Sequence, residues 1–271
     1  MISVTITDRD DDVYPFPKQL WDDPQVVYHG TWSVYSPRIE AEGFGHAELP
    51  FDHQDIATVM QARQALDLGS RAEVFFAKTP GQTRAELSMS GNFWGARVYA
   101  TDGGGEAVRL TIEDAKNFES FCASVETRAA KRGQWEDALR HYPTHGPTRE
   151  ALELLIDDAK MSALCTKVRL ARQRIESVAA GGFPAVYALH VEPQWFSNSW
   201  ERYIYHWEQG LRNAVELRCR RNLITRDRIA GKAMYPNGTD PVKQWDGFVT
   251  WKQLGLLPWD KTGSAELDKR Q

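Results

Sequence analysis

Cysteine is scarce in this sequence and its spacing suggests no cross-link or zinc site. Three cysteines, Cys122, Cys165 and Cys219, are spread over 271 residues, and none belongs to a CxxC pair. An odd number of widely separated cysteines does not indicate a disulfide framework. We therefore expect reduced thiols and no metal.

Long hydrophobic runs are also absent. No segment approaches the roughly 20 apolar residues that a membrane span needs. Asp8, Asp10, Asp11 and Asp12 occupy the N-terminal stretch where a signal peptide would be hydrophobic. We expect a cytoplasmic protein with no signal peptide and no membrane partner, and delivery into a target cell stays open.

Neither sign of charge dominates the chain. The formal net charge is −4, so the total charge does not favour a nucleic-acid or membrane partner. Hydrophobic residues make up 42% of the chain and aromatic residues 11%, which is enough for a sizeable core. The length suits one large domain or a domain with an insertion.

The first part of the chain predicts strands and helices in alternation. Gln25–Tyr28 is β-branched and aromatic and predicts a buried strand that ends at His29. Ser36 and Pro37 are typical of a helix start, and Gly43 of its end. The order is therefore strand, His29, short helix.

Four further elements are predicted before residue 102. Asp55–Leu68 has helical spacing, and Val74–Ala77 predicts a short strand. Thr83–Glu86 has the spacing of a capping box and predicts the start of a helix. Ala96–Thr101 predicts another strand, which ends at a glycine-rich turn.

The middle of the chain has helical spacing. A capping box at Thr111 opens an apolar face that continues to Gly133, and a second helix is predicted from about Thr148 to about Ala180. The end of the second helix is basic. We interpret that face as solvated rather than as a nucleic-acid contact; its cations are Lys167, Arg169, Arg172 and Arg174.

Strand character returns after residue 182. Ala185–Val191 and Ile229–Tyr235 are rich in β-forming residues, and Ala214–Cys219 is a shorter strand with Glu216 in its middle. A carboxylate between Val215 and Leu217 is an unusual choice for a strand interior.

Three segments together resemble the motifs of the ADP-ribosyltransferase superfamily, in its histidine–tyrosine–glutamate branch, which includes diphtheria-type toxins and poly-ADP-ribose polymerases. Tyr28-His29-Gly30-Thr31, followed by a helix that ends in Glu42-Gly43-Phe44, resembles the first motif. Val74-Phe75-Phe76-Ala77 resembles the second, where the family usually has tyrosine. Glu216, with the segment 223–229 after it, resembles the third.

The resemblance implies an α+β fold. Its core would be a split, mixed or antiparallel β-sheet, with a helical insertion at about 106–182 between the two halves. The chain 1–271 would then be one catalytic domain with an irregular tail at about 237–271.

The resemblance also implies which residues act on NAD. Cleavage of the nicotinamide–ribose bond develops positive charge on the ribose, which the carboxylate of Glu216 would stabilise. His29 would orient the adenosine-side ribose, and the backbone of Gly30 would pair with the carboxamide of nicotinamide. The cofactor-binding residues would be Tyr28, Gly30, Thr31, Phe75 and Phe76, and no metal would be needed.

Other interpretations of these residues stay open. His29 alone is more typical of a strand-end histidine bonded to a carbonyl group, and the Gly30-Thr31 that follows and the short helix favour the ligand role. Glu216 could face solvent on an edge strand, paired with Arg218 or Arg220, and Glu208 is a rival carboxylate.

The expected function is mono-ADP-ribosyl transfer from NAD to a macromolecular acceptor, as in a bacterial toxin, effector or defence enzyme. The acceptor, protein or nucleic acid, is undecided, and an antitoxin or activator stays open as a further partner. One alternative is an enzyme similar to RNA 2′-phosphotransferases. Another is a non-catalytic binding module with the same fold, using arginines around the third motif.

Overall fold

The computed structural model describes residues 1–6, 14–45, 51–65, 86–100, 106–141, 147–196, 198–212 and 214–237. It is an α+β structure with one six-stranded mixed sheet. The chain forms two compact units. The sheet unit comprises 1–47, 85–105 and 182–271, and the helical unit comprises 48–84 and 106–181.

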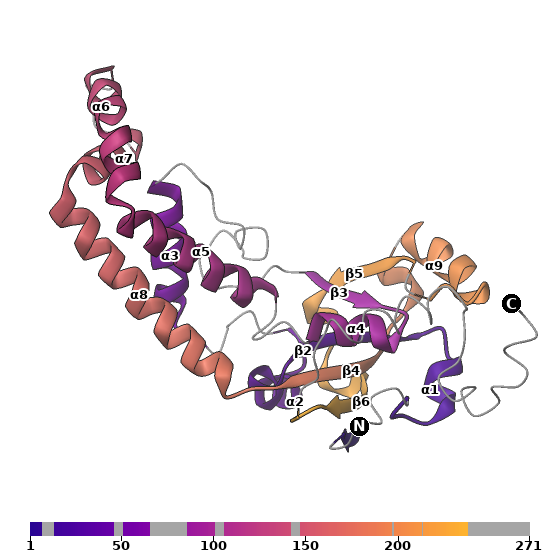
Figure 1. The fold of residues 1–271 in the computed structure, drawn as a ribbon. Coiled ribbons are helices and arrows are strands. Elements are labelled where there is room, and N and C mark those ends of the chain that lie inside the picture. The colour runs from indigo at the N-terminus through magenta and orange to yellow at the C-terminus, as the bar shows by residue number, and fades with distance from the viewer. Residues whose placement is uncertain are drawn as a thin grey trace, which may run out of the picture. The chain divides into compact units, whose positions relative to one another are not determined.

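The sheet has the strand order β1-β6-β4-β2-β3-β5 (Figure 1). β1 pairs in parallel with β6, and every other neighbouring pair is antiparallel. In chain order the strands are β1 (Ile2–Thr5), β2 (Val26–Trp32), β3 (Glu86–Ser90), β4 (Pro184–His190), β5 (Glu216–Arg220) and β6 (Ile229–Met234).

The two sides of β2 are paired very differently. Along β4 the ladder runs the whole length of β2, from Val26 with His190 to Trp32 with Pro184. Toward β3 it has a single register pair, Tyr28 with Ser90. The sheet therefore consists of a four-stranded part and a two-stranded part that are joined at one point.

Helix α4 (Phe93–Ala100) covers one face of the sheet over β2 and β4 (Figure 1). Asn92 caps its first turn, because the side-chain oxygen accepts hydrogen bonds from the backbone of Trp94 at 2.9 Å and of Gly95 at 3.3 Å. A Cβ atom at Gly30 would lie 1.7 Å from the carbonyl oxygen of Ala96. Glycine is therefore required at position 30 for α4 to approach β2.

The opposite face of the sheet packs against two further helices. Ile39 of α2 (Ser36–Glu42) and Tyr203 of α9 (Asn198–Glu208) join a core with Tyr187 and Leu217 of the sheet. The remaining short elements of the sheet unit are α1 (Lys18–Asp22) and the 3-10 turns Ser33–Tyr35, Pro193–Trp195, Arg221–Leu223 and Arg226–Arg228.

The helical unit is built around contacts of α3 (His53–Ala65), α5 (Glu106–Ala123) and α8 (Asp158–Ala180), which lie side by side (Figure 1). Phe118 and Val168 are among its fully buried residues. Two more helices, α6 (Val125–His141) and α7 (Pro147–Ile156), complete the described part of this unit.

Two arginines near the end of α8 form ion pairs within the helical unit. Arg172 binds Glu119 at 2.6 Å and Glu176 at 2.6 Å, and Arg174 binds the buried carboxylate of Asp55. These two cations of the basic helix end therefore have structural partners, which does not favour a nucleic-acid contact through them.

Several sequence-based element predictions are wrong. Ala96–Thr101, predicted as a strand, falls largely in α4. The prediction relied on β propensity, which does not detect the helix cap at Asn92. Glu86, predicted in a helix, begins β3, where Leu87 and Met89 alternate with exposed residues as in a strand. The strand that carries His29 does not end there but continues to Trp32, because β4 pairs with it throughout.

The predicted helical middle is broken into more pieces than expected. It contains four helices, and the two breaks that were not expected fall at Ser124 and at Asp157, whose side chain caps α8. The segment Val74–Ala77 and the predicted tail beyond residue 237 lie outside the described residues. Within the described part of the chain, no helix is long and apolar enough to cross a membrane.

Candidate functional site

His29 lies in the middle of the sheet, on β2, where Tyr187 is its partner on β4. Its Nδ1 is 2.8 Å from the carbonyl oxygen of Ser88, and its ring meets Phe44 edge to face, with centroids 5.2 Å apart. A carbonyl can only accept, so Nδ1 carries the hydrogen and Nε2 of the neutral ring is an acceptor. Nε2 has no hydrogen-bond partner in the described part of the chain.

The imidazole of His29 is neutral at physiological pH. Burial lowers its pKa and outweighs the Ser88 carbonyl, and the charge of Arg221 acts in the same direction as burial, so the pKa is about 4. A neutral ring with a free acceptor suits a hydroxyl group better than a phosphate group.

Arg221 supplies positive charge next to His29. It follows β5 directly, and its Nε donates to the carbonyl oxygen of Phe44 at 3.3 Å. No carboxylate among the described residues forms an ion pair with its guanidinium. Burial lowers the pKa of Arg221, although Tyr35 nearby acts in the opposite direction. A largely enclosed arginine without a counter-ion is a suitable partner for an anionic ligand.

Glu216 is the first residue of β5, at the edge of the sheet, and about half of its side chain is exposed. Its carboxylate accepts a hydrogen bond from Arg218 at 2.6 Å. Burial alone would raise the pKa of Glu216, but hydrogen bonds from Arg218 and Ser88 outweigh it and leave the pKa below its usual value. The carboxylate is therefore ionised. Its place on an edge strand, paired with Arg218, is the one that the alternative interpretation of Glu216 expected.

His29 and Glu216 lie on opposite faces of the sheet, which differs from the expected arrangement. Tyr28 is paired with Ser90, and Ser90 with Glu216, so these three side chains share one face. His29, next to Tyr28 in the strand, points to the other face. The strand register, which the sequence does not reveal, decides this placement.

Ser88 nevertheless connects the two residues. Its carbonyl oxygen accepts from His29 at 2.8 Å, and its side chain lowers the pKa of the Glu216 carboxylate. The sequence interpretation missed Ser88 because the capping-box spacing around it predicted a helix. The alternation of Leu87 and Met89 with polar residues was the signal that could have revealed the strand.

The first and third sequence motifs also meet through their backbones, beside His29. The backbone nitrogen of Phe44 donates to the carbonyl oxygen of Ile224 at 2.8 Å. Gly43 has a φ of 79°, and a Cβ atom there would lie 2.5 Å from the same oxygen. The end of α2 and the segment after β5 therefore form one close backbone contact, and it requires glycine.

The other residues expected to bind the cofactor differ in burial and in the face of the sheet on which they lie. Tyr28 is 1% exposed in the core, and its hydroxyl group hydrogen-bonds to that of Tyr14 at 2.6 Å, so its side chain has a structural role. Gly30 faces α4, which fills the space beside it. Thr31 is partly exposed on the same face as His29.

The aromatic residues predicted for the second motif cannot be placed. Phe75 and Phe76 lie outside the described residues. Among the described strands, β3 lies next to β2, and the helix after it, α4, carries Tyr99 with 61% of its surface exposed. Glu208, the rival carboxylate, is exposed at the last residue of α9, outside the sheet.

No group of three or more metal-binding side chains occurs among the residues that the structure describes. Comparisons of the chain with known protein families, with characterised proteins and with solved structures found no match. The function is therefore inferred from the site alone.

Proposed function

We propose that this protein is a mono-ADP-ribosyltransferase with an ADP-ribosyltransferase-like split sheet. It would cleave NAD between nicotinamide and ribose and transfer ADP-ribose to a macromolecular acceptor. The observation that carries the proposal is the position of β3, whose Ser88 carbonyl accepts a hydrogen bond from His29 and whose Ser90 is the strand partner of Glu216. It links the two residues to which the sequence motifs assign the chemistry, although they are far apart in the chain.

The sheet supports this proposal through the way β2 is paired. Among the described residues, β2 beyond Tyr28 has register pairs with β4 and none with β3, so alternate backbone N–H and C=O groups of His29–Trp32 point toward β3 without a ladder partner in that part of the chain. A carboxamide has one donor group and one acceptor, which match such a strand edge. Nicotinamide would bind at this edge near Gly30.

His29 and Arg221 would hold the other half of NAD. The acceptor nitrogen Nε2 of His29 would bind a hydroxyl group of the adenosine-side ribose. The guanidinium of Arg221, which acts electrostatically on His29, would bind the pyrophosphate. The neutral imidazole avoids a second positive charge beside Arg221.

Tyr99 is our candidate for the aromatic residue of the second motif, in place of Phe75. It lies one turn after Ala96 and just before Ala100, and both of these residues approach Gly30. Its exposed ring is therefore in the part of α4 nearest to the proposed nicotinamide site. Stacking on a flat ring is a common role for such a residue.

Glu216 would stabilise the positive charge that develops on the nicotinamide-side ribose. Because it shares a face with Tyr28 and Ser90 while His29 does not, NAD would have to bind across the junction of β2 and β3. A dinucleotide has two riboses separated by a pyrophosphate, so one ribose can reach each face. Arg218 would release the carboxylate when substrate binds.

A non-catalytic binding module is the second candidate, and the ion pair between Glu216 and Arg218 favours it. In that case Glu216 is a solvated edge residue with a structural partner.

Nicotinamide release from NAD, followed by chromatography, separates the two candidates. We expect release by the wild-type protein in the presence of cell extract as a source of acceptors, and a loss of about 100-fold in Glu216→Gln. The matched control Glu208→Gln should retain full activity. Equal activity in the wild type and Glu216→Gln would contradict the assigned role, and no release under any condition would favour the binding module.

A further inference from the structure

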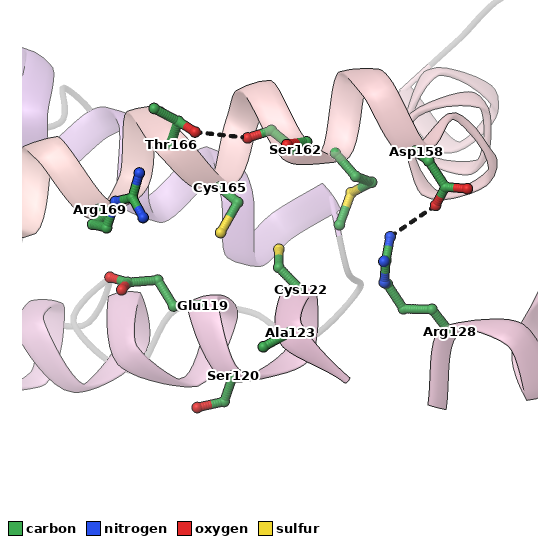
Figure 2. Close-up of a pocket in the computed structure, with 11 residues that line it drawn as sticks. Glu119, Ser120, Cys122, Ala123, Arg128, Asp158, Ser162, Cys165, Thr166 and Arg169 are labelled. Atoms are coloured by element: carbon green, nitrogen blue, oxygen red, sulfur yellow. Dashed lines mark hydrogen bonds and ion pairs between the residues drawn. The ribbon is translucent and has the colours of Figure 1, made fainter. Parts of the chain in front are cut away.

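A cavity of about 630 Å³ lies in the helical unit, lined by residues of α5, α6 and α8. Two of the three cysteines of the chain, Cys122 and Cys165, are on its wall (Figure 2). None of the sheet residues discussed above lines this cavity.

The two thiols face each other across the cavity. Cys122 lies in the last turn of α5 and Cys165 in the first half of α8, and Figure 2 shows both sulfur atoms pointing into the space between the helices. Cys165 is close enough to Cys122 to raise the pKa of its thiol. Both are free and partly exposed, so a small reagent can reach them.

The helices that carry the thiols are already held together. Phe118 of α5 and Val168 of α8 are fully buried in one core, a single turn before Cys122 and a single turn after Cys165. At the other end of the cavity, Arg128 donates to Asp158 at 2.9 Å. A bond between the sulfur atoms would therefore join groups that the fold already brings together.

Charged side chains surround the thiols on every helix of the cavity. Glu119 of α5, Arg128 of α6, and Asp158 and Arg169 of α8 line it. Burial, followed by the neighbouring Cys165, raises the pKa of Cys122 to about 12, so Cys122 is a protonated thiol at neutral pH.

We propose that Cys122 and Cys165 form a reversible disulfide site whose oxidant is a hydroperoxide. One thiol sulfur takes an oxygen atom from the peroxide and becomes a sulfenic acid; with hydrogen peroxide, water leaves. The second thiol attacks that sulfur, the sulfur–oxygen bond breaks, a second water leaves and the sulfur–sulfur bond forms. Two thiols are oxidised by two electrons in all, and the peroxide is reduced.

The new bond would close a loop of chain that contains α6 and α7. In the reduced protein, the described contacts across the base of this loop include the ion pairs of Asp158 with Arg128 and Arg132. The disulfide would add a covalent link at the same place. This inference does not depend on the proposed transferase activity.

The test uses the wild-type chain, so it does not depend on the folding of a variant. The protein is treated with hydrogen peroxide, denatured, alkylated and digested, and its peptides are weighed. We expect a peptide pair linked through Cys122 and Cys165, about 2 Da lighter than the two free peptides, that dithiothreitol separates. Cys219, buried in β5, should remain alkylated as the internal control.

A second measurement reports on the fold. We expect the midpoint of thermal unfolding of the helical unit to rise by about 5 °C on oxidation and to return on reduction, with no rise in Cys165→Ser. The proposal is overturned if both cysteines remain alkylatable, or if they are oxidised separately to sulfinic acids without a link.

Discussion

The polar groups around His29 in the sheet unit differ from the core arginines of the helical unit in whether they have a charged partner. In the helical unit, Arg172 and Arg174 are bound by carboxylates, and Arg63 is 3.5 Å from the fully buried Asp114. In the sheet unit, Arg221 has only a backbone carbonyl, and His29 has a free acceptor nitrogen.

This difference identifies the part of the molecule that can hold a ligand. Polar groups that are enclosed without a partner cost folding free energy, whereas paired groups mostly do not. In the helical unit, these arginines form ion pairs that hold its helices together. The face of the sheet around His29 and Arg221 keeps unsatisfied groups that an anionic, hydroxyl-bearing molecule such as NAD would satisfy.

The same substitution should have opposite effects in the two units. Gly30→Ala would place a methyl group 1.7 Å from the Ala96 oxygen, so we expect the free energy of unfolding to fall by about 3 kcal/mol or more. Gly133→Ala, in α6 with nothing within 4 Å, should raise it by about 0.5–1 kcal/mol. Urea unfolding of both variants measures this; equal effects would contradict the close approach of α4 to β2.

Acid should weaken the protein through His29. Its pKa is about 4 in the folded state and about 6.5 in the unfolded state, so the unfolded state takes up more protons between these values. Stability is therefore full above about pH 6.5 and falls as the pH is lowered toward 4. The loss due to this residue is about 2 kcal/mol at pH 5.

Comparing urea unfolding at pH 7 and pH 5 isolates this contribution. His29→Gln should lose less stability on acidification than the wild type. His53→Gln, at the exposed start of α3 in the helical unit, should behave as the wild type. Identical pH dependence in all three proteins would show that His29 is not held neutral.

Removal of one arginine from each unit should separate binding from stability. Arg221→Ala should weaken NAD binding about 10-fold, because it removes the proposed partner of the pyrophosphate. Arg172→Ala should leave binding unchanged and lower the free energy of unfolding by about 1–2 kcal/mol, since Glu119 loses its partner. Calorimetric titration and urea unfolding of both variants give the four values; equal NAD affinity in the two would contradict the role of Arg221.

Local patterns in the sequence were enough for much of the fold. The strand predicted at 185–191 is β4, the strand predicted at 229–235 is β6, and the short helix that stops at Gly43 is α2. In each case the residues of the segment favour a single type of element, and the turn residues next to it mark the same boundaries. The prediction failed at β3 and α4, where a capping-box spacing lies inside a strand and β-forming residues lie inside a helix.

The site depended on contacts that no local pattern encodes. His29 was recognisable from its own segment, but its partner Ser88 comes from another strand, and Arg221 was only one of five arginines near the third motif. Whether Glu216 shares a face with His29 is decided by the registers of β2, β3 and β5. A shift of one residue in the pairing of β2 with β3, or of β3 with β5, would place His29 and Glu216 on the same face.

Calorimetric titration of NAD into the wild-type protein and His29→Ala at pH 7 is the most direct test of the central claim, that the sheet around His29 holds NAD. Both proteins are first compared by thermal unfolding to confirm that they are folded. We expect the wild type to bind one NAD and His29→Ala to bind at least about 10-fold more weakly, because the acceptor for the ribose hydroxyl group is gone. No binding by the folded wild-type protein, or equal affinity in the two proteins, would contradict the claim.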